Sequence, residues 1–168
     1  MKTLRGLIAI LSITLTVAFA AHAQVNLTSL DGTRVNVEGQ TGKVVVLAIG
    51  ASWLPLSDKQ ADYMGTIAKR YAGKNVAFYF VVTDSAKPGS KNFASTEEIR
   101  KFVFENKLTV PVLRDPDGAV TLRRFKIEQV PSFVILDKSG AMAGEPFGGI
   151  DPKYDVTVPI SRAIDRLL

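Results

Sequence analysis

The chain has 168 residues, a formal net charge of +5, no cysteine and a single histidine, His22. Without cysteine it has no thiolate for disulfide exchange and no disulfide for stability. With its one histidine near the N-terminus, the rest of the chain lacks a Ser-His-Asp triad and the usual ligands of zinc and haem sites. Basic residues are interspersed with acidic ones, which is typical of solvated surfaces and argues against nucleic-acid binding.

Residues 1–23 have the pattern of a secretory signal peptide. Its parts are, in order, the basic residues Lys2 and Arg5, the uncharged apolar run Leu7 to Phe19, and the small-residue site Ala21-His22-Ala23. We predict cleavage before Gln24, which leaves one domain over residues 24–168 with a net charge of +3, since two cations and no acid are removed. The alternative is an uncleaved anchor, but the apolar run is shorter than the ~20 residues that span a bilayer. The expected location is therefore the periplasm or the medium, with no stable membrane insertion after cleavage.

The first predicted elements are a hairpin, a buried strand and a helix. Val25 to Val37 alternates loosely around Asp31-Gly32, where glycine can adopt the positive φ of a tight turn. Val44 to Ile49 is apolar throughout, as in a central strand that is covered on both faces. The capping-box pattern Ser57-x-x-Gln60 then predicts a helix from Asp58 to Tyr71 with Ser57 as its N-cap.

The rest of the chain alternates strands with helices, which predicts an α/β fold: a three-layer α/β/α sandwich with a mixed central sheet and an N-terminal β-hairpin. The expected elements are a strand at Val76 to Val82, a polar loop at Asp84 to Ser95, a helix opened by the capping box Ser95 to Glu98 and ending near Asn106, a strand at Val110 to Leu113, a short helix at Ala119 to Phe125, loop, strand and turn within Gln129 to Gly140, a returning strand at Met142 to Phe147, and a helix at Val158 to Leu168.

The turn between the first buried strand and the first helix carries the sequence Trp53-Leu54-Pro55-Leu56-Ser57. A Trp before such a corner and a Pro inside it resemble the active-site corner of thioredoxin-like proteins, above all the TlpA/ResA-type thiol-disulfide oxidoreductases, whose motif is Trp-Cys-Pro-x-Cys. Val110 to Asp115 is similar to a conserved strand segment of that family, and Val130-Pro131-Ser132-Phe133 is similar to the segment that carries its cis-proline. The resemblance covers nearly all of residues 24–168 and implies the thioredoxin-like fold.

The departures from the family concern its chemistry. Leu54 and Ser57 occupy the two cysteine positions, and Ala48 stands where thioredoxins place a buried acid. The resemblance therefore implies a member that has lost redox activity.

Each candidate site residue has a functional and a structural interpretation. Trp53 either contacts a partner or packs the corner, and both can hold. Leu54, Pro55 and Leu56 form an apolar binding patch unless Leu56 turns inward. Ser57 is a helix cap rather than a nucleophile, since no base is available. Val130 and Pro131, by the family resemblance, form a cis bond that leaves the Val130 backbone free for an extended peptide; the alternative is a trans proline that opens a strand.

We therefore expect a redox-inactive module that binds an unknown protein or an extended peptide in a groove between Trp53, Leu54, Val130 and Pro131. No cofactor, metal or nucleic acid is expected. The alternative is an enzyme of the same family that acts through a carboxylate, such as Asp58, Asp62 or Asp84, or through a cofactor thiol.

Overall fold

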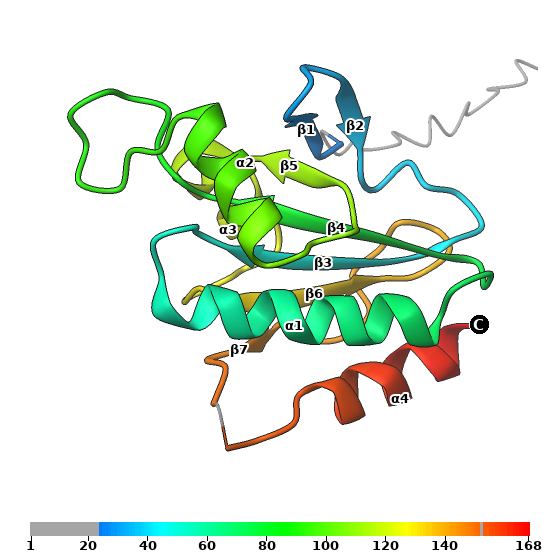
Figure 1. The fold of residues 1–168 in the computed structure, drawn as a ribbon. Helices are drawn as coiled ribbons and strands as arrows, with labels where there is room; N and C mark the ends of the chain where they lie inside the picture. The colour runs from blue at the N-terminus through cyan, green and yellow to red at the C-terminus, as the bar shows by residue number, and fades with distance from the viewer. Residues whose placement is uncertain (1–23, 152) are drawn as a thin grey trace, which may run out of the picture.

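The computed structural model describes residues 24–151 and 153–168 and has the predicted three-layer α/β architecture (Figure 1). The predicted signal peptide lies outside these residues, so its cleavage stays a prediction. The sheet has the strand order β2-β1-β5-β4-β3-β6-β7, with β3–β4 and β4–β5 parallel and the other pairs antiparallel. The strands are β1 (Asn26–Ser29), β2 (Arg34–Asn36), β3 (Val44–Gly50), β4 (Val76–Val82), β5 (Val112–Arg114), β6 (Ser132–Leu136) and β7 (Phe147–Gly148).

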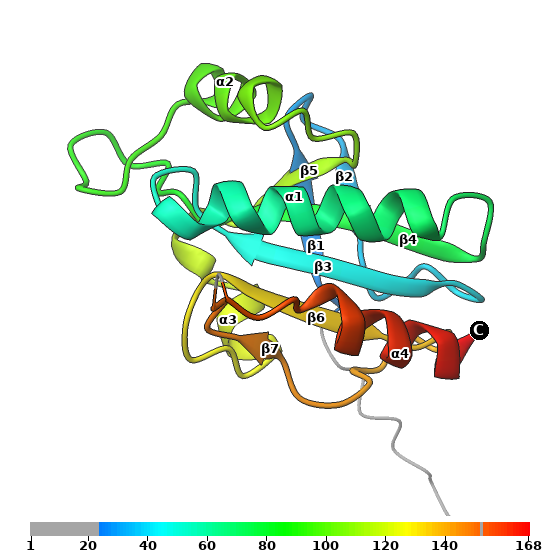
Figure 2. The same cartoon turned by 60° about the horizontal axis from the view of Figure 1, so that its bottom comes forward.

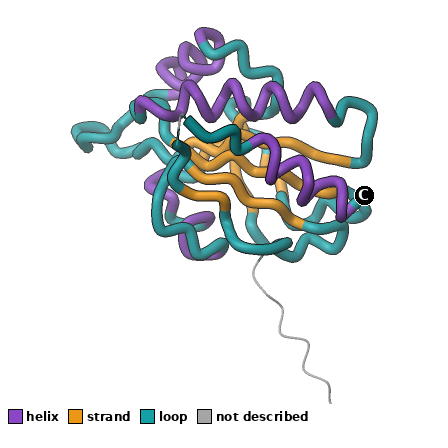
Figure 3. The backbone as a smooth tube through the Cα atoms, turned by 90° about the horizontal axis from the view of Figure 1, so that it is seen from below, coloured by secondary structure: helices purple, strands orange, loops and turns teal. Residues whose placement is uncertain are grey.

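Helices cover both faces of this sheet (Figure 3). They are α1 (Pro55–Arg70), α2 (Thr96–Glu105), α3 (Thr121–Arg124) and α4 (Thr157–Leu167), with a 3-10 turn, η1 (Pro116–Gly118), before α3. Figure 2 shows α1 and α4 running side by side along the central strands. Within the described ranges, no helix has both the length and the apolar character needed to cross a membrane.

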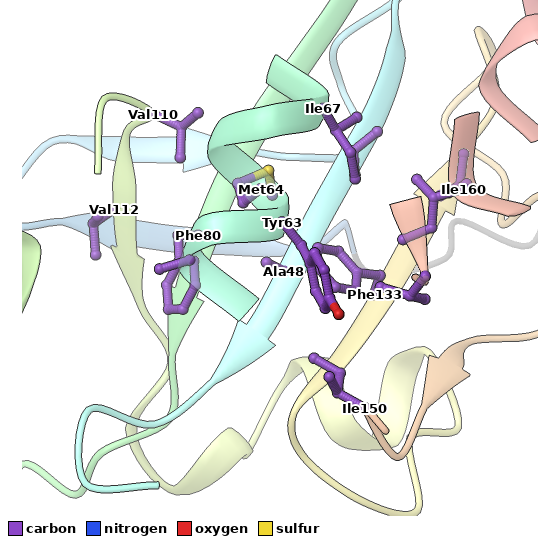
Figure 4. Packing of buried hydrophobic residues seen from close by; sticks show 14 of the residues in the cluster. Ala48, Tyr63, Met64, Ile67, Phe80, Val110, Val112, Phe133, Ile150 and Ile160 are labelled. Atoms are coloured by element: carbon purple, nitrogen blue, oxygen red, sulfur yellow. The ribbon is translucent and has the colours of Figure 1, made fainter. Parts of the chain in front are cut away.

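The buried apolar residues form two clusters because successive side chains of a strand point to opposite faces of the sheet. In β3, Val44, Val46 and Ala48 belong to the cluster covered by α1, α2 and α4. Their neighbours Val45, Leu47 and Ile49 belong to the cluster on the face of α3. Figure 4 shows the first cluster, where Met64 and Ile67 of α1 pack over the strands that carry Phe80 and Phe133.

The predicted start of α1 is wrong. The helix begins at Pro55, its N-cap is Leu54, and no side chain caps it. Proline at the first helical position needs no partner for a backbone N–H, and its fixed φ suits the helix. Ser57 therefore lies inside the first turn, where it is fully buried and forms no N-cap bond.

Three other boundaries differ from expectation. The strand predicted over residues 110–113 is β5, which spans Val112–Arg114. The predicted strand over residues 142–147 forms only the isolated bridge Leu136–Met142 and the two-residue strand β7, because Gly144, at φ +93°, and Pro146 interrupt it. The short helix predicted over residues 119–125 is confined to α3. The N-terminal hairpin and the Ser95 to Glu98 capping box are confirmed.

Candidate functional site

The corner between β3 and α1 exposes an aromatic ring on a tight backbone turn. The Leu54 N–H donates to the Ala51 carbonyl at 3.1 Å, and the Ser57 N–H donates to the Leu54 carbonyl at 2.9 Å. Trp53 lies on the outside of this turn, where it is 57% exposed, so packing against the corner covers less than half of its surface. Pro55 is also exposed, whereas Leu54 and Leu56 are half-buried. Trp53 and Pro55 therefore supply most of the exposed apolar surface at this corner, and the two leucines contribute only part of theirs.

Beneath the corner, a buried glutamine joins α1 to two strands. Gln60 is fully buried, and its Nε2 donates to the Ile49 carbonyl at 3.3 Å and the Ser132 carbonyl at 2.7 Å. Its Oε1 has no hydrogen-bond partner among the described residues. A Cβ atom on Gly50 would clash with this oxygen and would lie 2.9 Å from Ser57 Oγ. A side chain at the end of β3 would therefore force Gln60 and Ser57 to move.

The loop before α1 is also attached to the end of β4. Asp84 is fully buried, and its carboxylate accepts hydrogen bonds from Ser52 N–H at 2.9 Å and Ser52 Oγ at 2.5 Å. Thr83 donates to the Gly50 carbonyl from its backbone N–H at 2.8 Å and from Oγ1 at 3.0 Å. These bonds fix the backbone that presents Trp53.

The second predicted segment of the groove lies next to the corner. Ser132 pairs with Ile49 in the sheet, and Gln60 connects α1 to the same serine. The Val130–Pro131 peptide bond is cis, as expected, with Pro131 buried and Val130 half-buried. Across residues 24–151 and 153–168, neither the N–H nor the carbonyl of Val130 has a hydrogen-bond partner. An unpaired backbone segment thus lies beside the corner.

A polar cavity of about 580 Å³ opens on the same loop. It lies between the loop before β6 and the segment that leads into β7. Its lining residues are Lys126, Glu128, Gln129, Ser132, Glu145, Pro146 and Gly148. The cavity therefore adjoins the Val130–Pro131 segment through its neighbours Gln129 and Ser132.

The carboxylates that the alternative enzyme hypothesis named lie in different surroundings. Asp58 is exposed and accepts a hydrogen bond from Asn106 Nδ2 at 3.1 Å, and Asp62 is exposed on the next turn of α1. Both carboxylate oxygens of Asp84 accept hydrogen bonds from Ser52. In the part of the chain that the structure describes, no three His, Cys, Asp or Glu side chains are grouped to hold a metal ion.

Sequence reasoning missed the roles of Gly50, Ser52 and Gln60, and it did not predict the burial of Asp84, which it placed at the start of a polar loop. One available signal was Pro55, because proline favours the first helical position and would have placed Ser57 within the first turn. The bond between Gln60 and Ser132 joins residues 72 positions apart and had no local signal.

Comparison with known proteins places these features in a family. The family model described as Redoxin matches residues 16–144. The chain is 25% identical over 118 residues to thiol-disulfide oxidoreductase ResA of Bacillus thuringiensis subsp. konkukian (strain 97-27), covering 70% of this chain and 62% of ResA. It is 26% identical over 117 residues to the thioredoxin-like protein YneN of Bacillus subtilis (strain 168), covering 70% and 64% of the two chains. The matches thus span less than two thirds of these relatives.

Solved structures share the fold. The dsbF structure from MTB, in mixed oxidized and reduced forms, superimposes with a TM-score of 0.67 at 23% identity, covering 86% of this chain and 96% of that one. The pneumococcal exposed lipoprotein thioredoxin Etrx1 of Streptococcus pneumoniae strain TIGR4 gives 0.67 at 24% identity, covering 86% and 100%. At these identities the similarity establishes the thioredoxin-like fold alone.

Proposed function

Because this chain belongs to the redoxin family and yet contains no cysteine, we propose that it binds an extended segment of a partner protein without thiol-disulfide exchange. The observation that carries the proposal is the unpaired backbone of Val130 beside the exposed ring of Trp53. The relatives named for thiol-disulfide oxidoreduction share the fold, and fold does not determine activity.

The corner supports binding and offers no atom for redox catalysis. Disulfide exchange begins with attack by a thiolate. Leu54 has no ionisable group, and Ser57 is fully buried next to an uncharged glutamine. A hydroxyl with no adjacent base is not activated as a nucleophile.

The proposed binding mode is addition of a β-strand. An extended peptide would donate to and accept from the Val130 backbone, and its side chains would contact Trp53, Leu54 and the cavity at Gln129. A few such hydrogen bonds contribute about 0.5–1.5 kcal/mol each. Together with a small apolar contact, they predict a dissociation constant of about 1–100 µM.

The proposed location is outside the cytoplasm. It rests on the pattern of residues 1–23, and one structural neighbour, Etrx1, is described as an exposed lipoprotein. The intact mass of the protein recovered from the exported fraction should correspond to a chain that begins at Gln24. A mass that includes residues 1–23 would refute cleavage.

Binding can be tested by titrating the protein into fluorescein-labelled extended peptides and following polarisation. We expect saturable binding, a shift of the Val130 amide resonance in ¹H–¹⁵N spectra, and an affinity about tenfold weaker for Trp53→Ala. Tyr154→Ala is a matched control because it removes another aromatic ring of similar exposure, 59% against 57% for Trp53. Equal affinities of Trp53→Ala and the unmodified protein, or an unshifted Val130 amide, would contradict the proposal.

A further inference from the structure

The outer face of α2 carries an apolar hollow that plays no part in the corner. Phe104 is 84% exposed, although α2 buries Ile99 and Phe102 on its inner side. Beside Phe104 lies a hollow of about 560 Å³ between α2 and the turn that follows β1. Its lining residues are Leu30, Arg100, Val103, Phe104, Lys107, Leu108 and Thr109.

This hollow continues toward the sheet. A second hollow of about 250 Å³ shares Leu30, Arg100 and Val103 with the first and extends to Pro111. Figures 1 and 2 show α2 beside the β1–β2 turn, and Arg100 Nη2 joins them by donating to the Leu30 carbonyl at 2.8 Å. The two hollows form one groove, called here the α2 groove, with an exposed phenyl ring at its margin. The α2 groove thus combines this exposed ring with the half-buried apolar side chains of Leu30, Val103 and Leu108.

The charge of the α2 groove is uneven along its length. Arg100 and Lys107 line the hollow beside Phe104, and no acidic residue lines it. Lys101, on the same helix, is paired with Glu105 at 3.8 Å. Asp31 is at the other end, in the second hollow. The end with the exposed ring is therefore cationic.

This pattern discriminates between possible occupants. A second copy placed on a two-fold axis would set Arg100 and Lys107 against the same cations, which like-charge repulsion disfavours. Residues 1–23 contain Lys2 and Arg5 and no acidic residue, so their charge also repels that end of the groove. A partner segment with carboxylates has the complementary charge.

We propose that the α2 groove binds an acidic amphipathic segment of a partner protein. Its apolar side chains would pack on Leu30, Phe104 and Leu108, and its carboxylates would pair with Arg100 and Lys107. This interaction is independent of peptide binding at Trp53, because the two sites share no residue. They are neighbours, however, since Asn106 at the end of α2 donates to Asp58 in the first turns of α1.

The test uses two synthetic amphipathic peptides with the same leucine and phenylalanine positions, one with glutamate and one with lysine at every polar position. Polarisation of the labelled peptides is measured against the full chain at low and at ~0.3 M salt. We expect saturable binding of the glutamate peptide, weakened by salt, and no binding of the lysine peptide.

Two variants locate the binding. Phe104→Ser should lower the affinity for the glutamate peptide about tenfold or more, because an apolar contact is lost. Lys107→Glu should lower the affinity for the glutamate peptide and bring the affinities for the two peptides closer together. Both side chains are exposed, so circular dichroism should match that of the unmodified protein. Lys101→Glu, on the same helix but outside the lining, should have a smaller effect than Lys107→Glu, and that effect should disappear at ~0.3 M salt because it acts only through the long-range field. Trp53→Ala should leave both affinities unchanged.

The proposal is overturned if the glutamate peptide fails to bind, if the lysine peptide binds equally well, or if Phe104→Ser has no effect. Concentration-dependent dimerisation that Phe104→Ser abolishes would assign the groove to a second copy and would also overturn it. Loss of binding in Trp53→Ala alone would place the peptide at the corner instead.

Discussion

Replacing Gln60 by glutamate should make the stability of the protein depend on pH. The site is fully buried, and Gln60 donates to the carbonyls of Ile49 and Ser132 at 3.3 and 2.7 Å. A protonated glutamic acid can retain one of these bonds through its hydroxyl. An ionised carboxylate would instead face two carbonyl oxygens without solvent, so the pKa of the new carboxyl should rise well above its ordinary value.

The magnitude follows from linkage between protonation and folding. Burial raises carboxyl pKa values by up to about 3–5 units, and each unit corresponds to about 1.36 kcal/mol. A shift of about 3 units, from a pKa of about 4.3 in the unfolded chain to about 7 in the folded one, lowers the free energy of unfolding by about 4 kcal/mol between low and high pH. The pKa of this carboxyl is higher in the folded than in the unfolded state. The corresponding part of the unfolding free energy is therefore fully present below about pH 4 and is lost as the pH rises through about 7.

Urea unfolding of Gln60→Glu and the unmodified protein between about pH 3.5 and 8, followed by circular dichroism, measures the effect. The difference in unfolding free energy should be constant at low pH and grow by several kcal/mol by pH 8. Gln60→Leu removes the Nε2 donors without adding a charge. It should lower the free energy of unfolding by about 1–3 kcal/mol, and this loss should not vary with pH. Gln129→Glu places the same charge at an exposed position and should have little effect. A pH-independent cost of Gln60→Glu would refute the reasoning.

Gly50→Ala should destabilise the protein by about 1–3 kcal/mol because its methyl group would meet Gln60 and Ser57. Gly65→Ala, whose Cβ meets nothing within 4 Å, should raise the melting temperature instead. Leu54→Cys together with Ser57→Cys should restore only weak insulin reduction, because Ala48 stands where thioredoxins place the acid that assists proton transfer; rates equal to those of a cysteine-bearing relative would contradict this. The Ser29 hydroxyl and the Thr33 N–H lower the pKa of Asp31 to about 2, so its stabilising bonds should persist until the pH falls toward 2. In NMR titrations, Ser29→Ala should move that midpoint toward 3.8.

Local sequence predicted most of the fold. Continuous apolar runs marked β3 and β4, Asp31-Gly32 marked the first turn, and Ser95 with Glu98 marked the start of α2. These signals act over a few residues and agree with the tertiary structure. The order of the strands in the sheet came only with the structure, since pairing such as that of β1 with β5 joins distant segments.

The candidate site was less predictable because its supports are long-range. Ser57 and Gln60 have the spacing of a capping box, and that pattern is local. Their burial depends on Gly50 and Ser132, which approach from two strands. Trp53 and the Val130–Pro131 segment were identified through family resemblance, whereas the exposure of Phe104 had no signal in the sequence.

The bonds that fix the corner also determine how it responds to its surroundings. Ser52 with Asp84, Thr83 with Gly50, and Gln60 with Ser132 are all hydrogen bonds. None of them is a disulfide, and the chain has no cysteine, so the corner cannot alternate between dithiol and disulfide forms. Its shape, and any affinity that depends on that shape, should therefore not follow the thiol-disulfide balance of its surroundings. A partner held there would stay bound when oxidants or reductants interconvert the cysteine pairs of other proteins in the same compartment.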